Sequence, residues 1–127
     1  MNKNTSKLVY WAPRILAILF LVFLAVFSLD VIQPGLSTGE IIRGLLMHNI
    51  PVFVLGILLI IAWKHEIVGG IAFLLAGLLY SGLMIPRAIN SEAPWYHALS
   101  WILTIAGPAF LVGILFLVSW FSKKEAK

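Results

Sequence analysis

Four long apolar stretches follow one another along the chain, and each is long enough to cross a lipid bilayer as a helix. They run over residues 8–29, 41–63, 67–86 and 96–122. An α-helix rises about 1.5 Å per residue, so roughly 20 apolar residues cross the roughly 30 Å of hydrocarbon in a bilayer. The pattern therefore predicts an all-α fold: a four-transmembrane-helix bundle in which residues 1–127 form a single membrane domain.

The composition agrees with a chain surrounded by lipid. Hydrophobic residues make up 61% of the sequence and charged residues 11%, whereas about 25% of the residues in a soluble domain are charged. The lipid bilayer is therefore an expected partner. The basic residues lie at the ends of the apolar stretches instead of forming one basic stripe, so we expect no nucleic acid as a partner.

The distribution of Lys and Arg predicts the orientation. With four spans, both termini and the turn between the second and third spans lie on one side. Seven of the nine basic residues fall on that side, and Arg43 and Arg87 fall on the other. Because the side rich in Lys and Arg faces the cytoplasm, we expect both termini to be cytoplasmic.

Two segments, in the second and fourth stretches, resemble each other. Residues 51–63 read PVFVLGILLIIAW and residues 108–120 read PAFLVGILFLVSW, with six of thirteen positions identical at an offset of 57 residues. Four of the identities are Pro, Phe, Gly and Trp, which favours an internal duplication. Each unit would be a helical hairpin, and the two hairpins would run parallel about an axis along the membrane normal. The first and third stretches show no comparable match at this offset.

Polar residues accompany the two prolines that begin these segments. A proline inside a helix frees the carbonyl four residues earlier, so Pro51 and Pro108 are expected to kink their helices at equivalent depths. His48 and Asn49 precede the first proline, Thr104 precedes the second, and these three residues form the candidate polar intramembrane site. Two interpretations remain open. The site is either a small polar cavity for a proton or a polar ligand, or a set of hydrogen bonds that holds the kinked helices together with His48 neutral.

The other ionisable residues occur at matched depths, which favours ion pairs. Arg14 and Glu66 are both predicted near the inner boundary, and Asp30 is predicted near the outer boundary with Arg43 and Arg87. A charge without a partner is costly inside a membrane, so we expect structural pairing at each level.

The sequence contains no motif of a known catalytic or metal site. His65 and Glu66 are followed by IVGG, without a second histidine at the zinc-protease spacing. There is no glycine-rich phosphate loop, GxSxG elbow or carboxylate dyad, and the chain has no cysteine. We therefore expect no enzymatic activity, no metal and no cofactor.

Four segments carry a resemblance to a known group of proteins: LVYWAPRILAILF, MHNIP, AWKHEIVGGI and GPAFLVGILFLVSW. The chain resembles, over nearly its whole length, a family of small four-helix prokaryotic integral membrane proteins with a domain of unknown function. The resemblance implies a location in the plasma membrane of a prokaryote and no assigned activity, so no functional residue is carried over. Small multidrug exporters are similar in size and span number, but they carry an acidic residue in the first helix, where this chain has Arg14.

Two classes of function follow from these observations. The favoured one is an accessory or structural membrane component that associates with other membrane proteins or with itself as a homo-oligomer. The alternative is a small transporter or channel that uses the polar site around His48 and Thr104. The small residues of the third and fourth stretches distinguish the two classes: an outward small-residue face favours association, whereas polar groups that converge on a cavity favour transport.

Overall fold

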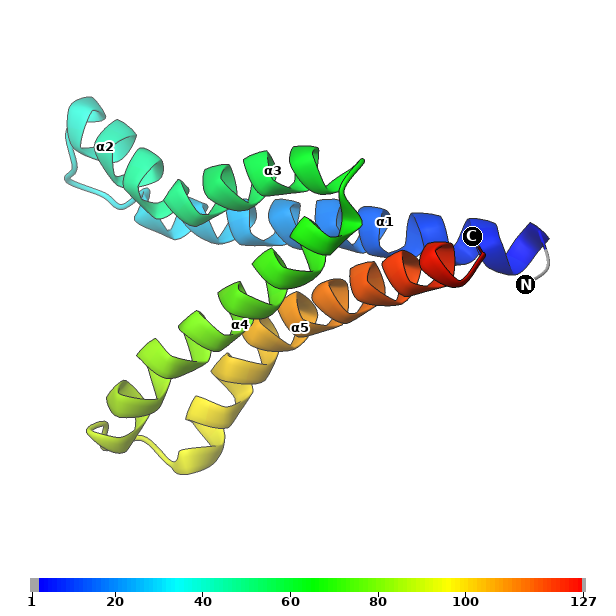
Figure 1. Cartoon of the computed structure of the whole chain (residues 1–127). Coiled ribbons are helices and arrows are strands. Elements are labelled where there is room, and N and C mark those ends of the chain that lie inside the picture. The colour runs from blue at the N-terminus through cyan, green and yellow to red at the C-terminus, as the bar shows by residue number, and fades with distance from the viewer. Residues whose placement is uncertain (1–2, 127) are drawn as a thin grey trace.

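The structure is a computed structural model that describes residues 3–126, and these residues are almost entirely helical (Figure 1). In chain order the elements are α1 (Lys3–Phe27), the short 3-10 helix η1 (Ser28–Val31), α2 (Thr38–His48), α3 (Ile50–Ala62), α4 (Glu66–Ile89) and α5 (Trp95–Ala126). The predicted all-α fold is confirmed.

The described chain contains three helices that are long and apolar enough to cross a membrane, and a bent pair supplies a further candidate. The three are Lys3–Val31, Glu66–Ile89 and Trp95–Lys124. α2 and α3 meet the same criterion only when they are taken together, and they are bent by 44° at the break between them. The sequence predicted one helix over residues 41–63, so the second stretch differs from the prediction by this break.

Asn49 and Pro51 account for the break between α2 and α3. Pro51 has no N–H to donate to the carbonyl of Met47. Asn49 lies at the break and donates twice to the carbonyl of Leu45, from its backbone N–H at 3.1 Å and from Nδ2 at 2.8 Å. Pro108, in contrast, lies inside the continuous helix α5. The helix is therefore interrupted beside Pro51 and continuous through Pro108.

The helices form two hairpins that diverge like the arms of a V (Figure 1). In one hairpin α1 lies beside α3 and η1 lies beside α2, and in the other α4 lies beside α5. The arms meet at the end that holds both chain termini and the α3–α4 turn, which we call the terminal end. They separate toward the end that holds the α1–α2 and α4–α5 connections, which we call the loop end. The helices therefore do not close into one bundle along their full length.

The hydrophobic core lies where the two arms meet. Its buried members come from α1, α3, α4 and α5: Ala17, Phe20, Leu55, Leu59, Ala62, Phe73, Ala109, Val112 and Phe116.

Within the second arm, glycines allow the backbones of α4 and α5 to come close together. A Cβ on Gly113 would lie 3.0 Å from the carbonyl oxygen of Gly70 and 3.0 Å from the backbone nitrogen of Leu74. Small residues permit such close packing between membrane helices. The small residues of the third and fourth stretches are thus used at an internal seam.

Candidate functional site

A cavity of about 620 Å³ lies between the two arms toward the loop end, and we call it the loop-end cavity. Its volume falls within the roughly 300–1,000 Å³ that is typical of small-molecule sites. Core residues such as Phe20, Leu55 and Ala109 form part of its lining. Its lining also includes residues with polar atoms, which are Asp30, His48, Tyr80, Trp101 and Thr104. The cavity therefore combines an apolar floor with several polar groups.

The structure brings two of the three predicted polar residues to this cavity, from opposite arms. His48 ends α2 and Thr104 lies on α5, and both side chains are exposed along the lining. The hydroxyl of Thr104 donates to the carbonyl of Ser100 at 2.7 Å. Within residues 3–126, the His48 side chain takes part in no hydrogen bond. The two polar groups thus share one cavity without contacting each other.

The third predicted residue, Asn49, is not part of the cavity lining. Its Nδ2 bonds to the α2 backbone at the helix break, as described above. Its Oδ1 is buried and has no hydrogen-bond partner within the described chain. The role of Asn49 in this structure is therefore local, at the junction of α2 and α3.

Three further residues of the lining were not assigned to this site by the sequence. Asp30 was expected to pair with Arg43 or Arg87, but within residues 3–126 it forms no ion pair with either one. Tyr80 lies four residues after Ala76 on α4, and Trp101 lies three residues before Thr104 on α5. Spacings of three and four residues place side chains on one helix face. This periodicity was the available signal for Tyr80 and Trp101.

A second polar site lies at the terminal end, where Arg14 and Glu66 are brought together. Arg14 Nη1 lies 3.8 Å from Glu66 Oε2, and the two side chains are only 0% and 3% exposed. The ammonium group of Lys123 contacts the other carboxylate oxygen, Oε1. These three residues, which we call the terminal ion cluster, join α1, α4 and α5. Lys123 was not part of the ion pair predicted from the sequence.

Backbone carbonyls and an aromatic ring hold the guanidinium of Arg14. Nη1 donates to the carbonyl of Tyr10 at 2.6 Å, and Nη2 donates to the carbonyl of Trp63 at 2.7 Å. The guanidinium carbon also lies 3.7 Å from the centroid of the Tyr10 ring, which is a cation–π distance. A buried charge needs such additional partners because the loss of hydration is costly. These contacts engage the two terminal nitrogens of Arg14 at the junction of the arms, whereas the buried Arg14 Nε and Glu66 Oε2 have no hydrogen-bond partner within the described chain.

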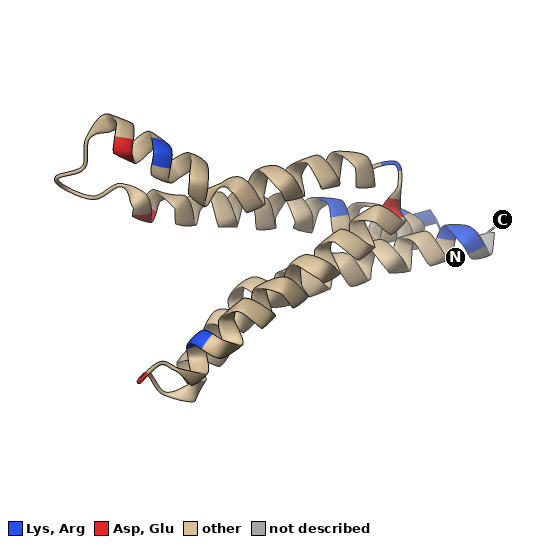
Figure 2. Ribbon diagram, turned by 60° about the vertical axis from the view of Figure 1, so that its left-hand side comes forward, with Lys and Arg blue, Asp and Glu red and all other residues tan. Residues whose placement is uncertain are grey.

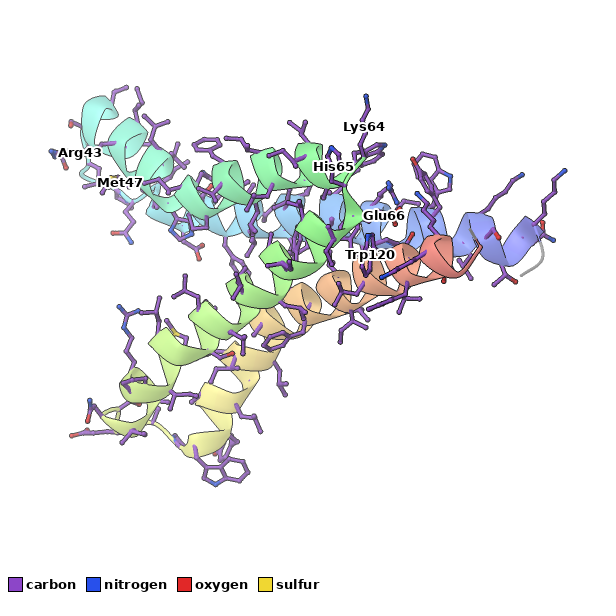
Figure 3. The ribbon with its side chains drawn as sticks, viewed as in Figure 1. Arg43, Met47, Lys64, His65, Glu66 and Trp120 are labelled. Atoms are coloured by element: carbon purple, nitrogen blue, oxygen red, sulfur yellow. The ribbon has the colours of Figure 1, made fainter. Side chains whose placement is uncertain are left out.

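Beside this cluster lies a second pocket, of about 570 Å³, which we call the terminal pocket. It is formed by the α3–α4 turn and the end of α5, around the labelled residues Lys64, His65, Glu66 and Trp120 in Figure 3. Figure 2 shows that many of the Lys and Arg residues gather at this end of the molecule. The remaining lining residues are Ile67, Lys123 and Lys124.

Neither site resembles a metal centre. Among residues 3–126, no group of three or more His, Cys, Asp or Glu side chains is placed to hold a metal ion.

These features define a small all-helical protein whose helices are apolar enough to be membrane spans, with one cavity between its arms and one beside a buried ion cluster. The chain belongs to the family of the domain of unknown function DUF7670, whose model matches residues 1–127. The sequence was expected to resemble a family of unknown function over nearly its whole length. The match over residues 1–127 agrees with this expectation. No curated protein and no solved structure matches the chain.

Proposed function

We propose that this protein is a multi-pass protein of a prokaryotic plasma membrane that binds a small amphipathic molecule in the loop-end cavity, as a small transporter. The observation that carries the proposal is a single cavity of about 620 Å³ with an apolar floor and polar groups from both arms. In this proposal α2 and α3 form one bent span, so that the chain crosses the membrane four times, both termini face the cytoplasm and the cavity lies in the outer half. The excess of Lys and Arg at the terminal end supports this orientation.

The lining favours an amphipathic ligand over an inorganic ion. Phe20, Leu55 and Ala109 offer no hydrogen bonds and suit an apolar body. Asp30 and His48 are exposed residues of the same lining, and they suit a polar head group that carries hydrogen-bond donors. An apolar floor does not hold ordered water, which requires two to four polar partners. The ligand therefore enters with its apolar part toward the core.

Transport fits the shape of the cavity better than a channel does. The cavity lies between diverging arms, and the buried core and the terminal ion cluster fill the junction of those arms. A site that is accessible from one side and closed on the other is what a carrier presents in one of its two states. A channel would need a continuous polar path through the same junction. We propose binding and transport without an enzymatic reaction, metal or cofactor.

The accessory or structural component remains the second candidate, and one observation favours it. Among the described elements, the backbone of α3 lies close to α1, α2 and α4, and the helix leaves Ile57 and Ile60 61% and 74% exposed. This face is available to a helix of another membrane protein or of a second copy. Against it, the glycines at the α4–α5 seam are occupied within the chain. The transporter is the preferred proposal for two reasons. The glycines between α4 and α5 already pack within the chain, and polar groups from both arms line one cavity.

The proposal is tested with photoreactive amphiphiles on the full-length protein in nanodiscs. A primary alkylamine that carries a diazirine in its alkyl chain is activated by light, and the labelled residues are mapped by mass spectrometry. We expect labels on cavity residues such as Val52 and Ile105. Ala76→Phe places a ring in the cavity and should reduce this labelling severalfold.

Leu75→Phe is the matched control for this experiment. Leu75 neighbours Ala76 on α4 but does not line the cavity, and it is 58% exposed. Its substitution should leave the labelling of the cavity unchanged. Equal labelling in the two variants, or labels confined to the exposed face of α3, would contradict binding in the cavity.

A further inference from the structure

We infer that the terminal pocket binds the phosphate group of an anionic phospholipid. This site is separate from the loop-end cavity, and the inference does not depend on transport. It requires only that the helices span a bilayer, because the lipid then reaches the pocket from its own leaflet. The pocket is built by segments that are far apart in the sequence, residues 64–67 and residues 120–124.

The charges that line the pocket leave an excess of positive charge. The lining contains three lysines and one carboxylate, that of Glu66. Both Arg14 and Lys123 already contact this carboxylate, so its charge is compensated within the cluster. Lys64 and Lys124 form no ion pair with a carboxylate within the described chain. These two ammonium groups are the ones available to an anion.

The Trp120 side chain lines the terminal pocket and contacts Lys124. The ammonium nitrogen of Lys124 lies 5.1 Å from the centroid of the Trp120 ring, within cation–π range. This contact holds one ammonium group at the edge of the pocket, while Lys64 and His65 approach from the α3–α4 turn. Lys64 and Lys124 donate to the non-bridging oxygens of a phosphate, and such charge-assisted hydrogen bonds are stronger than neutral ones.

The position of the pocket favours a lipid over free phosphate, although both offer the same phosphate chemistry. Ile67 and Trp120 add apolar surface to the lining. Directly after the turn, α4 enters its long apolar segment. A phosphodiester in the pocket can therefore keep its acyl chains against the apolar helices. Basic pockets between membrane helices on the cytoplasmic side commonly bind anionic head groups in this way.

The experiment compares lipid retention by the full-length protein in nanodiscs of phosphatidylcholine with a minor fraction of phosphatidylglycerol. Lipids that remain bound after gentle release from the nanodisc are identified by native mass spectrometry. The wild-type protein should retain phosphatidylglycerol in excess of its share of the bilayer. Lys64→Gln with Lys124→Gln removes both available charges but keeps Lys123 on Glu66. We expect the double variant to lose this preference by on the order of tenfold.

The matched control removes two charges from the same end of the molecule but outside the pocket. Lys3 and Lys7 are exposed on the first turns of α1, and neither lines the pocket. Lys3→Gln with Lys7→Gln should retain the phosphatidylglycerol preference. If both double variants lose it equally, the attraction comes from the general surface charge and the inference is overturned.

A second arm of the experiment separates the lipid from free phosphate. Inorganic phosphate is added in millimolar excess to the wild-type nanodiscs. Phosphatidylglycerol retention should persist, because the acyl chains hold the lipid beside the helices. Complete displacement by phosphate would overturn the assignment to a lipid.

Discussion

The two ends of this molecule differ in the burial and the partners of their charged and polar side chains. At the terminal end, two side chains of opposite charge are almost completely buried, and each one is held by further groups. At the loop end, Asp30 and His48 are exposed on the lining of a cavity, and within the described chain neither forms an ion pair. Buried polar contacts thus join the two arms at the terminal end, whereas the cavity separates them at the loop end.

A physical reason for this difference lies in which partners each polar group finds. Arg14 has a carboxylate, two carbonyls and an aromatic ring within reach, which compensate the loss of hydration at its two terminal nitrogens. His48 sits at the end of α2 beside a helix break, and the opposite arm lies across the cavity. Interhelical polar contacts in membranes are typically worth only about 1 kcal/mol. Within the described chain, no polar contact of His48 crosses the cavity to join the arms at the loop end.

The largest expected effect is the loss of one charge from the terminal ion cluster. Glu66→Gln leaves Arg14 and Lys123 as two neighbouring cations without their carboxylate, and breaking a buried pair costs about 3–5 kcal/mol. Arg14→Met should cost less, because Lys123 still contacts Glu66. The free energy of unfolding in detergent, measured by titration with a denaturing detergent, checks both values. Arg87→Met removes an exposed charge and serves as the control.

The same pair offers a test of coupling. The double variant Arg14→Met with Glu66→Gln removes both charges, so it should be less destabilised than the sum of the single variants predicts. Strict additivity of the three free energies would mean that the pair at 3.8 Å is energetically irrelevant. In that case the ion cluster would not explain why the terminal end is closed.

A smaller effect is expected from substitutions of the glycines between α4 and α5. Gly113→Ala brings a Cβ to 3.0 Å from the backbone of α4, which forces the helices apart and should destabilise the protein by about 1–3 kcal/mol. Gly107→Ala lies on the same helix, and its Cβ would meet nothing within 4 Å. That substitution should be neutral or stabilising by up to about 1 kcal/mol. Equal effects of the two variants on the thermal midpoint would remove the seam as a cause of the close packing.

Pro51→Ala tests the origin of the bend, with a smaller effect on stability. Alanine restores an N–H that can bond to the carbonyl of Met47, so the 44° bend between α2 and α3 should decrease. Spin labels at Arg43 and Ile57 would report the change as a longer distance between the ends of the two helices. Pro108→Ala, inside the continuous helix α5, is the control and should leave this distance unchanged. An unchanged distance in Pro51→Ala would assign the bend to Asn49 instead.

Much of this fold could be predicted because hydropathy and charge are read directly along the chain. The apolar stretches, the prolines and the matched depth of Arg14 and Glu66 required no knowledge of packing. The divergence of the arms could not be predicted, because it depends on which side chains face each other across the molecule. Lys123 was missed for a related reason: its long side chain reaches Glu66 from the end of α5, where the sequence shows only a basic terminus.

The two prolines show a further limit of the sequence. Both were expected to kink their helices, since the missing N–H is the same in each case. Asn49, two residues before Pro51, supplies a side-chain donor that bonds to the carbonyl of Leu45 at the break. The residue two positions before Pro108 is Ala106, which has no such donor, and α5 continues.

The smallest effect on stability is expected at the loop end, for His48→Gln. The His48 side chain is exposed and makes no hydrogen bond within the described chain, so nothing is lost from the fold when it is replaced. The free energy of unfolding should change by no more than about 0.5 kcal/mol, as at other exposed positions. If His48 contacts the head group of the ligand, its replacement should still decrease the labelling of the cavity by the photoreactive alkylamine. A loss of stability as large as that of Arg14→Met would instead show that the loop end is held by a polar contact of His48, and the distinction between the two ends would fail.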